Sequence, residues 1–388
     1  MKTILTNARV VTPEWDDLGS VVVEDGRIVE VVRGRIFSEG LDLCGQWLTP
    51  GCIDIHSDYL ERELHPRPSA NFSLPLAFHF MDQRAITCGL TMVFSAISFT
   101  EDQHFNRKFG DAVEQAKHID DVRNDTMGRH YLHARLDPNT NATLEYLDAL
   151  HDIDSLTMVV YNDSIPGQRQ FNMEQTIKMR VDYLNVSEEE AIRLIEEKIV
   201  ERSAINNRGP IMEAFQGKAI LGSHDDTLVE HIDEAKEFGC TLSEMPTTIE
   251  AARRAKEEDL LVCMGAPNYV RGGSHCGNLA CSDAMDEDLV DIICSDYHFP
   301  SILGSVIKMV DNGISPSRAF DFVALNPARL IEMDQDLGSI KEGKVADLVA
   351  FHPVVDHARV SHVWVDGEPV YQAQVKSVAA IQENLKAG

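Results

Sequence analysis

The sequence predicts an α/β protein, namely a (β/α)₈ barrel of the TIM type with a small β-domain built from both ends of the chain. Three observations predict it. The two ends are rich in strand-like segments, eight apolar segments alternate with helix-like ones between them, and polar side chains gather where those eight segments end. We place the β-domain at residues 1–50 plus 339–388 and the barrel at residues 51–338.

Each end of the chain contains a predicted β-hairpin. Asp25-Gly26 and Asp366-Gly367 each separate two strand-like runs, and Asp-Gly pairs favour tight turns of the primed type. Because both ends share this pattern, we expect them to form one β-sandwich.

The middle of the chain alternates apolar strand-like runs with amphipathic segments. Ser187 and Thr247 each precede a glutamate by three residues and predict capping boxes, Ser315 precedes a proline at a predicted helix start, and Gly239 predicts a helix end. The eight predicted strands are residues 51–56, 90–98, 130–137, 156–163, 218–226, 239–246, 260–268 and 290–298. A parallel barrel of such units carries its active site at the C-terminal strand ends.

Composition limits the classes of partner. The 388 residues include 63 Asp and Glu against 35 Lys and Arg, and the formal net charge of −28 argues against nucleic acid and anionic membrane as bulk partners, because such surfaces would be repelled. A small anionic substrate would need local cations. The eight cysteines contain no C-x-x-C pair, which argues against a zinc ribbon or a disulfide framework. The sequence shows neither a signal peptide nor a run of about 18 apolar residues, so we expect a cytoplasmic protein.

Polar side chains, most of them of types that can bind metals, lie where nearly all of the predicted strands end. In chain order they are His56, Asp58, His133, Arg135, Asp137, Asp163, His224, Asp225, Asp226, Glu244, Asp296 and His298, with Arg135 as the one cation among them. Imidazole together with carboxylate suits Zn²⁺, Mn²⁺ or Fe²⁺, so we expect one or two divalent ions, with zinc favoured. We expect His56 to bind the metal directly, and Asp58 to do the same rather than only orient His56. Asp296 is the expected catalytic group that accepts the proton of the attacking water.

Several cations are predicted in the same loops. Arg67, Arg135, Arg169 and Arg271 follow strand ends, and arginine binds phosphate oxygens in a bidentate way. The segment "RGGSHCGN" adds glycines whose backbone N–H groups can approach an anion closely. Taken singly, each arginine could be an ion-pair partner on this acidic protein, but together they predict local cations around a small negatively charged ligand, such as a phosphorylated substrate. Self-association is open, because the sequence shows no seam for it.

The ends of the chain resemble a known superfamily. The opening "ILTNARVVTP…VVVEDGRIVEVV…GQWLTPGCIDIHSD" and the ending "NPARLI…LGSIKEGKVADLVAF…VWVDGEPVY" are similar to the amidohydrolase superfamily. The resemblance implies a metal-dependent hydrolase on a distorted (β/α)₈ barrel, with a small β-sandwich formed by both termini.

A narrower resemblance is to the PhnM family of phosphonate catabolism. It is carried by "HSDYLERELHPRP", "IPGQRQF", "LGSHDD", "SEMPTT", "MGAPNYVRGGSHCGN" and "CSDYH". It implies cleavage of α-D-ribose 1-methylphosphonate 5-triphosphate to the 5-phosphate and pyrophosphate, that is, a diphosphatase. The His-x-Asp pair of residues 56 and 58 is then this family's variant of the superfamily's His-x-His.

The resemblance also implies roles for individual residues. The implied metal ligands are His56, Asp58, His224 and Asp296, with Glu244 as a ligand or a substrate contact. The implied substrate contacts are Arg67, Arg169, Arg271 and His275. From their strand ends we add Asp137 to the expected metal ligands, and Arg135, Asp163 and Asp225 to the expected substrate contacts.

Two departures from the PhnM pattern touch the site. Asp137 stands where the family is expected to have glutamate, and Ser164-Ile165 stand where it more usually has His-Thr. A carboxylate at residue 137 is one methylene shorter than that glutamate, so its bridging role and the substrate are both in question.

Two other readings compete with the diphosphatase. The first is an amidohydrolase that acts on a C–N bond, a cyclic amidase or a deaminase; the fourth predicted strand end has no lysine, which disfavours the carbamylated-lysine bridge of many cyclic amidases. The second is a barrel that has lost its metal and serves as a scaffold. The joint presence of His56, His224 and Asp296 speaks against it.

Overall fold

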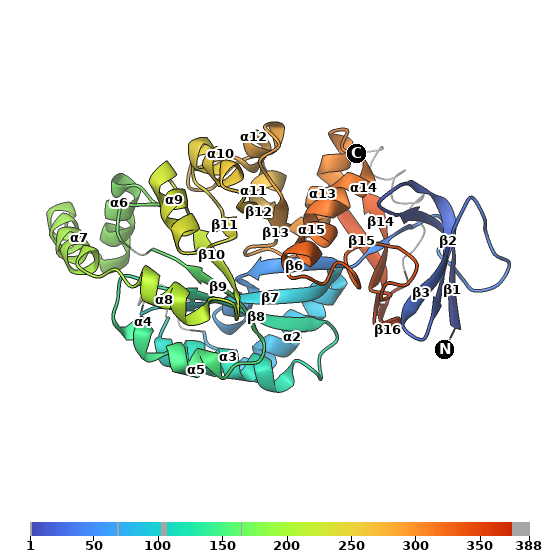
Figure 1. Cartoon of the computed structure of the whole chain (residues 1–388), viewed down its shortest axis with the longest axis horizontal. Helices are drawn as coiled ribbons and strands as arrows, with labels where there is room; N and C mark the ends of the chain where they lie inside the picture. The colour runs from blue at the N-terminus through green and yellow to red at the C-terminus, as the bar shows by residue number, and fades with distance from the viewer. Residues whose placement is uncertain (1, 68–69, 102–106, 164, 375–388) are drawn as a thin grey trace. The chain divides into compact units, whose positions relative to one another are not determined.

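The computed structural model describes residues 2–67, 70–101, 107–163 and 165–374. Both ends of the chain contribute to one sheet, in the order β16-β15-β14-β5-β1-β2-β3, with β4 paired to β1. In Figure 1 the blue and orange-red strands of this sheet lie together. The strands are β1 (Lys2–Val11), β2 (Asp16–Glu24), β3 (Arg27–Arg33), β4 (Leu41–Asp42), β5 (Trp47–Pro50), β14 (Leu348–Val354), β15 (His357–Val365) and β16 (Glu368–Gln372).

The predicted hairpin turns are confirmed. Asp25-Gly26 has φ values of 48° and 80°, and Asp366-Gly367 has 53° and 75°, so both central residues are left-handed as a type I′ turn requires. Side chains from both ends of the chain, among them Val21, Leu48 and Leu348, share one buried core. This shared core holds the two ends of the chain in one sheet.

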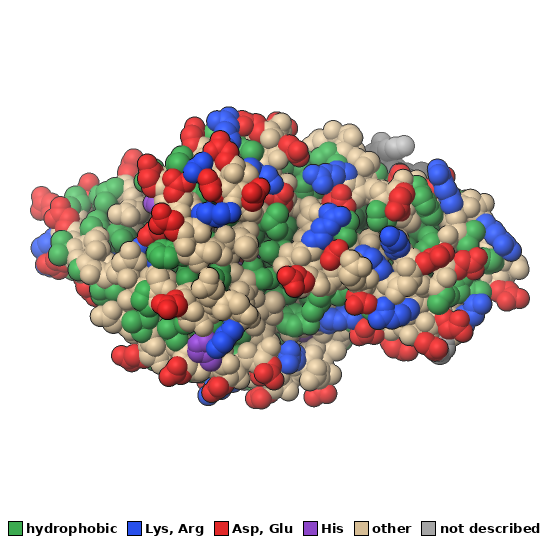
Figure 2. Space-filling model, in the orientation of Figure 1, with side chains coloured by type: hydrophobic (Ala, Val, Ile, Leu, Met, Phe, Trp, Pro, Cys, Tyr) green, Lys and Arg blue, Asp and Glu red, His purple; other side chains and the backbone are tan. Residues whose placement is uncertain are grey.

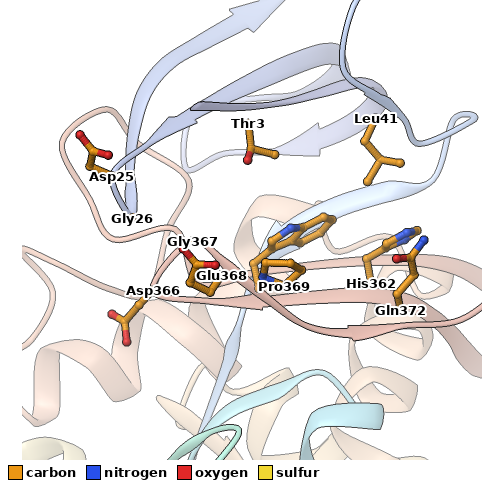
Figure 3. Close-up of a pocket in the computed structure, with 11 residues that line it drawn as sticks. Thr3, Asp25, Gly26, Leu41, His362, Asp366, Gly367, Glu368, Pro369 and Gln372 are labelled. Atoms are coloured by element: carbon orange, nitrogen blue, oxygen red, sulfur yellow. The ribbon is translucent and has the colours of Figure 1, made fainter. Parts of the chain in front are cut away.

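A cavity of about 400 Å³ lies in this terminal sheet (Figure 3). Thr3 and Leu41 line it from the N-terminal strands, and His362, Trp364 and Gln372 line it from the C-terminal strands. Its described lining includes none of the predicted site residues.

The second sheet consists of eight consecutive strands in the order β13-β12-β11-β10-β9-β8-β7-β6. Its first and last strands meet, because Ser57 and Asp296 form a parallel bridge and the Asp296 N–H donates to the His56 carbonyl at 3.0 Å. The predicted barrel is therefore confirmed, as a near-closed one. Its strands are β6 (Cys52–Ser57), β7 (Leu90–Phe99), β8 (Arg129–Leu136), β9 (Leu156–Tyr161), β10 (Ile220–His224), β11 (Leu242–Glu244), β12 (Leu261–Gly265) and β13 (Ile292–Cys294).

Helices follow the barrel strands, and two predicted helix starts are confirmed. The Ser187 and Ser315 hydroxyls accept from the backbone N–H three residues on, at 3.2 and 3.3 Å. Thr247 was the wrong residue for the third cap: Thr248 accepts from the Ala251 N–H, because the Thr247 hydroxyl is bonded to that of Thr227 at 2.7 Å.

The helices and their bounds are α1 (Tyr59–Leu64), α2 (Leu74–Thr87), α3 (Phe109–Val122), α4 (Ala142–Glu145), α5 (Leu147–His151), α6 (Met173–Leu184), α7 (Glu188–Ser203), α8 (Arg208–Phe215), α9 (Val229–Glu237), α10 (Ile249–Glu257), α11 (Ala266–Arg271), α12 (Cys281–Asp286), α13 (Ser301–Asp311), α14 (Pro316–Phe320), the π-helical turn η1 (Asp321–Leu325) and α15 (Asn326–Leu330). Gly239, with φ of 78°, follows the end of α9 as expected. Among the described residues, no helix is both long enough and apolar enough to cross a membrane.

The chain divides into two compact units. Unit one comprises Met1–Phe94, Asn124–His130 and Ile292–Gly388, and unit two comprises Ser95–Arg123 and Tyr131–Asp291. Unit one therefore contains the terminal sheet with β6 and β13, and unit two contains β9 to β12. Acidic side chains are spread over the face seen in Figure 2, with basic ones between them, as the net charge of −28 leads one to expect.

Candidate metal centre

A group of three metal-binding side chains lies where β6 and β13 end, in unit one. His56 is the penultimate residue of β6, Asp58 directly precedes α1, and Asp296 follows β13. Their ligand atoms all lie within 4.8 Å of one another, and His56 Nε2 is 3.9 Å from Asp58 Oδ1. The bond from the Asp58 N–H to the Asp296 carbonyl, at 2.8 Å, holds the two segments together.

This group suits a divalent ion. One imidazole and two carboxylates form a donor set used for Zn²⁺, Mn²⁺ and Fe²⁺. His56 is buried, with 1 % of its surface exposed, whereas Asp58 and Asp296 are partly exposed. The group therefore combines a fixed imidazole with carboxylates that solvent can reach, which fits the metal roles expected of all three residues.

Asp54 on β6 stabilises the position of this group through hydrogen bonds to the residue before Asp296. Its buried carboxylate accepts from the Ser295 N–H at 2.8 Å and from the Ser295 hydroxyl, so it joins β6 to the residue before Asp296. Burial raises the pKa of Asp54 to about 7, against the lowering effect of the Ser295 hydrogen bonds. The sequence signal for this role is a carboxylate inside an otherwise apolar strand.

A second group of ionisable side chains lies at the strand ends of unit two. His133 Nε2 on β8 is 3.5 Å from Glu244 Oε2 on β11, and both side chains are fully buried. His224, the last residue of β10, has its Nδ1 at 2.9 Å from Asp225 Oδ2. Burial opposes protonation of His224, but the carboxylates of Asp225 and Glu244 outweigh it and raise its pKa.

Arg169 lies in a buried network of charges in unit two. Its Nε is 3.2 Å from Asp163 Oδ2, and its Nη1 donates to Asp226 Oδ1 at 2.9 Å. Arg208 also pairs with Asp163, and both guanidinium groups lie over the ring of Tyr161. Sequence reasoning did not identify Arg208, which lies on a helix rather than at a strand end.

Asp137 is engaged in a different ion pair. One of its oxygens accepts from Arg202 of α7 and from Thr100 at 3.2 Å, and the other accepts from the Asn139 N–H at 2.9 Å. Its expected role as a metal ligand stays a prediction. Arg202 was not identified from the sequence, because it lies in the last turn of a helix rich in charged residues.

The remaining predicted substrate contacts differ in exposure. Arg135 is buried and donates to the Ala96 carbonyl at 3.0 Å. Arg67, Arg271 and His275 are exposed, with Arg271 at the end of α11 and beside Gly272, whose φ is 83°. Ser164, one of the two departures from the family pattern, lies outside the described residues.

Comparisons with known proteins give the family. The amidohydrolase family model matches residues 189–370. The chain is 32% identical over 382 residues to the alpha-D-ribose 1-methylphosphonate 5-triphosphate diphosphatase of Escherichia coli (strain K12). The matched region covers 95% of this chain and 100% of that enzyme. It is also 32% identical over 129 residues to an adenine deaminase of Clostridium botulinum (strain 657 / Type Ba4), covering 30% of this chain and 21% of that enzyme.

Solved structures share the fold. A Xaa-Pro dipeptidase with bound methionine matches with a TM-score of 0.66 at 15% identity, over 96% of this chain and 100% of that one. A D-hydantoinase matches with a TM-score of 0.62 at 13% identity, over 96% and 95%. Since the similarity to the Escherichia coli enzyme runs over nearly the whole of both chains, the chain belongs to the amidohydrolase superfamily, where it is PhnM-like, and it is a hydrolase.

Proposed function

We propose that this chain is a metal-dependent diphosphatase that cleaves a phosphoanhydride of a ribose 5-triphosphate. The observation that carries the proposal is the 32% identity over 95% of the chain to the alpha-D-ribose 1-methylphosphonate 5-triphosphate diphosphatase. The expected substrate is that compound, and the expected products are its 5-phosphate and pyrophosphate.

His56, Asp58 and Asp296 are the residues of unit one that would hold a divalent ion, zinc, manganese or iron by their chemistry. Such an ion acts as a Lewis acid and makes water a better nucleophile at neutral pH. Asp296 is the expected proton acceptor, because its carboxylate is partly exposed while its backbone is fixed to β6 on both sides.

Water would attack phosphorus, and the bond that breaks would join the phosphate kept on the ribose to the leaving pyrophosphate. The exposed side chains of Arg67, Arg271 and His275 are the ones we assign to the phosphate oxygens. The charges of Arg67 and Arg271 offset the local repulsion that a chain of net charge −28 would exert on a triphosphate.

The test is a paired release assay on metal-reconstituted protein. Ribose 5-triphosphate compounds are incubated and pyrophosphate is measured, in parallel with ammonia release from adenine and a panel of cyclic amides. Pyrophosphate without ammonia supports the proposal. Ammonia without pyrophosphate refutes it and favours C–N hydrolysis, the reaction class to which the partial similarity to adenine deaminase points.

Substitution at Arg271 separates binding from chemistry in the same assay. Arg271→Ala should raise KM for the triphosphate by about 10-fold or more, since a bidentate arginine contact to phosphate is lost. The control is Arg193→Ala, on an exposed face of α7 where Arg193 pairs with Glu190 and Glu197. Equal KM values for the two variants would contradict the assignment of Arg271.

A further inference from the structure

The surroundings of Arg169 differ from those of a phosphate contact. Only 2 % of its side chain is exposed. Two carboxylates flank the guanidinium, Asp163 at 3.2 Å from Nε and Asp226 at 2.9 Å from Nη1. A guanidinium enclosed in this way has almost no surface left for a substrate oxygen.

The same guanidinium is hydrogen-bonded to the end of β10, where His224 lies. Arg169 Nη1 donates to the backbone carbonyl of His224 at 3.1 Å. The backbone then turns, because Asp225 has a φ of 56° and its N–H donates to the Glu244 carbonyl at 2.9 Å. The direction of the His224 side chain therefore depends on a short segment held at both of these points.

Asp226 anchors Arg169 to the sheet. Its second oxygen, Oδ2, accepts from the Ser223 and Ser243 hydroxyls, the latter at 2.8 Å. Ser223 on β10 and Ser243 on β11 are register partners, so Asp226 joins two neighbouring strands just below their ends. Asp226 is fully buried, and its charge is compensated by Arg169.

We propose that Arg169 is a positioning residue for the metal ligand His224 and not a contact of the substrate. The guanidinium fixes the C-terminal end of β10 through the His224 carbonyl and through Asp226, which is bonded to both strands. The proposal deepens the proposed function and rests on it in one respect, the assignment of His224 as a metal ligand.

Charge alone does not perform this role, since three contacts must be met by one rigid planar group. Arg169 donates from Nη1 to both Asp226 and the His224 carbonyl, and the same rigid plane places Nε 3.2 Å from Asp163, whereas a lysine ammonium is a single point. Arg169→Lys therefore keeps the buried charge and loses the geometry. Arg208→Lys is the matched control, because Arg208 shares Asp163 with Arg169 and contacts Glu234 instead of β10.

The experiment measures the affinity of the metal-free protein for Mn²⁺ by titration calorimetry, followed by kcat and KM for pyrophosphate release. We expect Arg169→Lys to weaken Mn²⁺ binding by about 10- to 100-fold, as removal of a partner behind a metal ligand does, and to lower kcat with KM changed by less than about 3-fold. Arg208→Lys should keep Mn²⁺ affinity within about 3-fold of the unsubstituted protein. An Arg169→Lys protein with unchanged Mn²⁺ affinity and a raised KM would overturn the proposal and make Arg169 a substrate contact.

A milder variant covers the case in which Arg169→Lys does not fold. Ser243→Ala removes one hydrogen bond to Asp226 and leaves every charge in place, and we expect Mn²⁺ affinity to fall by about 3- to 10-fold. Unchanged affinity in that variant would count against the positioning role. If the unsubstituted protein binds Mn²⁺ but releases no pyrophosphate, the diphosphatase proposal fails while the Mn²⁺ comparison stands. If it binds no Mn²⁺, both proposals fail.

Discussion

Loss of Arg202 on α7 should disturb the segment that follows β8. Its guanidinium pairs with Asp137, and the side chains of the two residues are 10 % and 2 % exposed. Replacing Arg202 with methionine keeps most of the side-chain volume and leaves the Asp137 carboxylate buried without this cation. The Thr100 hydroxyl and the Asn139 N–H would remain as its hydrogen-bond donors.

The expected cost follows from this burial. Removing one partner of a buried ion pair destabilises a protein by about 3–5 kcal/mol, because the other charge stays desolvated. Arg202→Met should lower the free energy of unfolding by that amount. Adding Asp137→Asn should restore most of it, since a neutral amide in the same place has no charge to desolvate.

The assay is urea unfolding of metal-free protein in chelator, so that no bound ion can replace the arginine. Arg193→Met is the control, because Arg193 is 53 % exposed and its surface ion pairs are worth less than about 1 kcal/mol. A cost below about 1 kcal/mol for Arg202→Met would refute the reasoning. It would mean that Asp137 does not depend on Arg202, which would favour its expected role as a metal ligand.

Three further predictions concern stability. Burial and the cation of Arg169 lower the pKa of His231 from 6.5 to about 4. The stability that the neutral His231 side chain allows is therefore complete above pH 6.5 and is lost as the pH falls towards 4. His231→Asn should make the free energy of unfolding less dependent on pH in that window. Gly51→Ala would place Cβ 2.2 Å from Thr91 Oγ1 and 2.8 Å from Thr91 Cβ, and should cost about 1–3 kcal/mol in urea unfolding; Thr91→Ala in the same chain should recover only part of that cost, because Cβ of residue 91 remains. Ser187→Ala removes the N-cap of α7 and should cost about 1 kcal/mol in the same assay, whereas no change would show that the cap is dispensable.

Much of the fold could be predicted from local sequence patterns. The Asp-Gly turns require left-handed backbone at both central residues, and short apolar runs bounded by polar residues mark buried parallel strands. The cap of α10 was misplaced by one residue. Thr247 and Thr248 are equivalent by local pattern, and only tertiary bonds distinguish them. The Thr247 hydroxyl is bonded to that of Thr227, whereas the Thr248 hydroxyl donates to the Thr227 carbonyl and accepts from the Ala251 N–H of the helix.

The site residues at the ends of the barrel strands could be predicted from the sequence, whereas those on the neighbouring helices could not. His56, Asp58 and Asp296 could be brought together because first and last strands of a barrel are neighbours. The helix residues Arg202 and Arg208 carry no local signal, since an arginine on a helix, whether in the charged α7 or at the start of α8, is usually solvated. Exposure also could not be predicted, so Arg169 looked the same as Arg271 in the sequence although one is buried and the other is not.

The central claim is that the His56, Asp58 and Asp296 group performs phosphoanhydride hydrolysis, and one variant tests it directly. Asp296→Asn is loaded with metal, its metal content is measured, and pyrophosphate release from the ribose 5-triphosphate substrate is compared with that of the unsubstituted protein. A proton acceptor contributes about 10²- to 10⁴-fold to such a reaction, so the account predicts a loss of kcat in that range. An Asp296→Asn protein that releases pyrophosphate at the unsubstituted rate would contradict it.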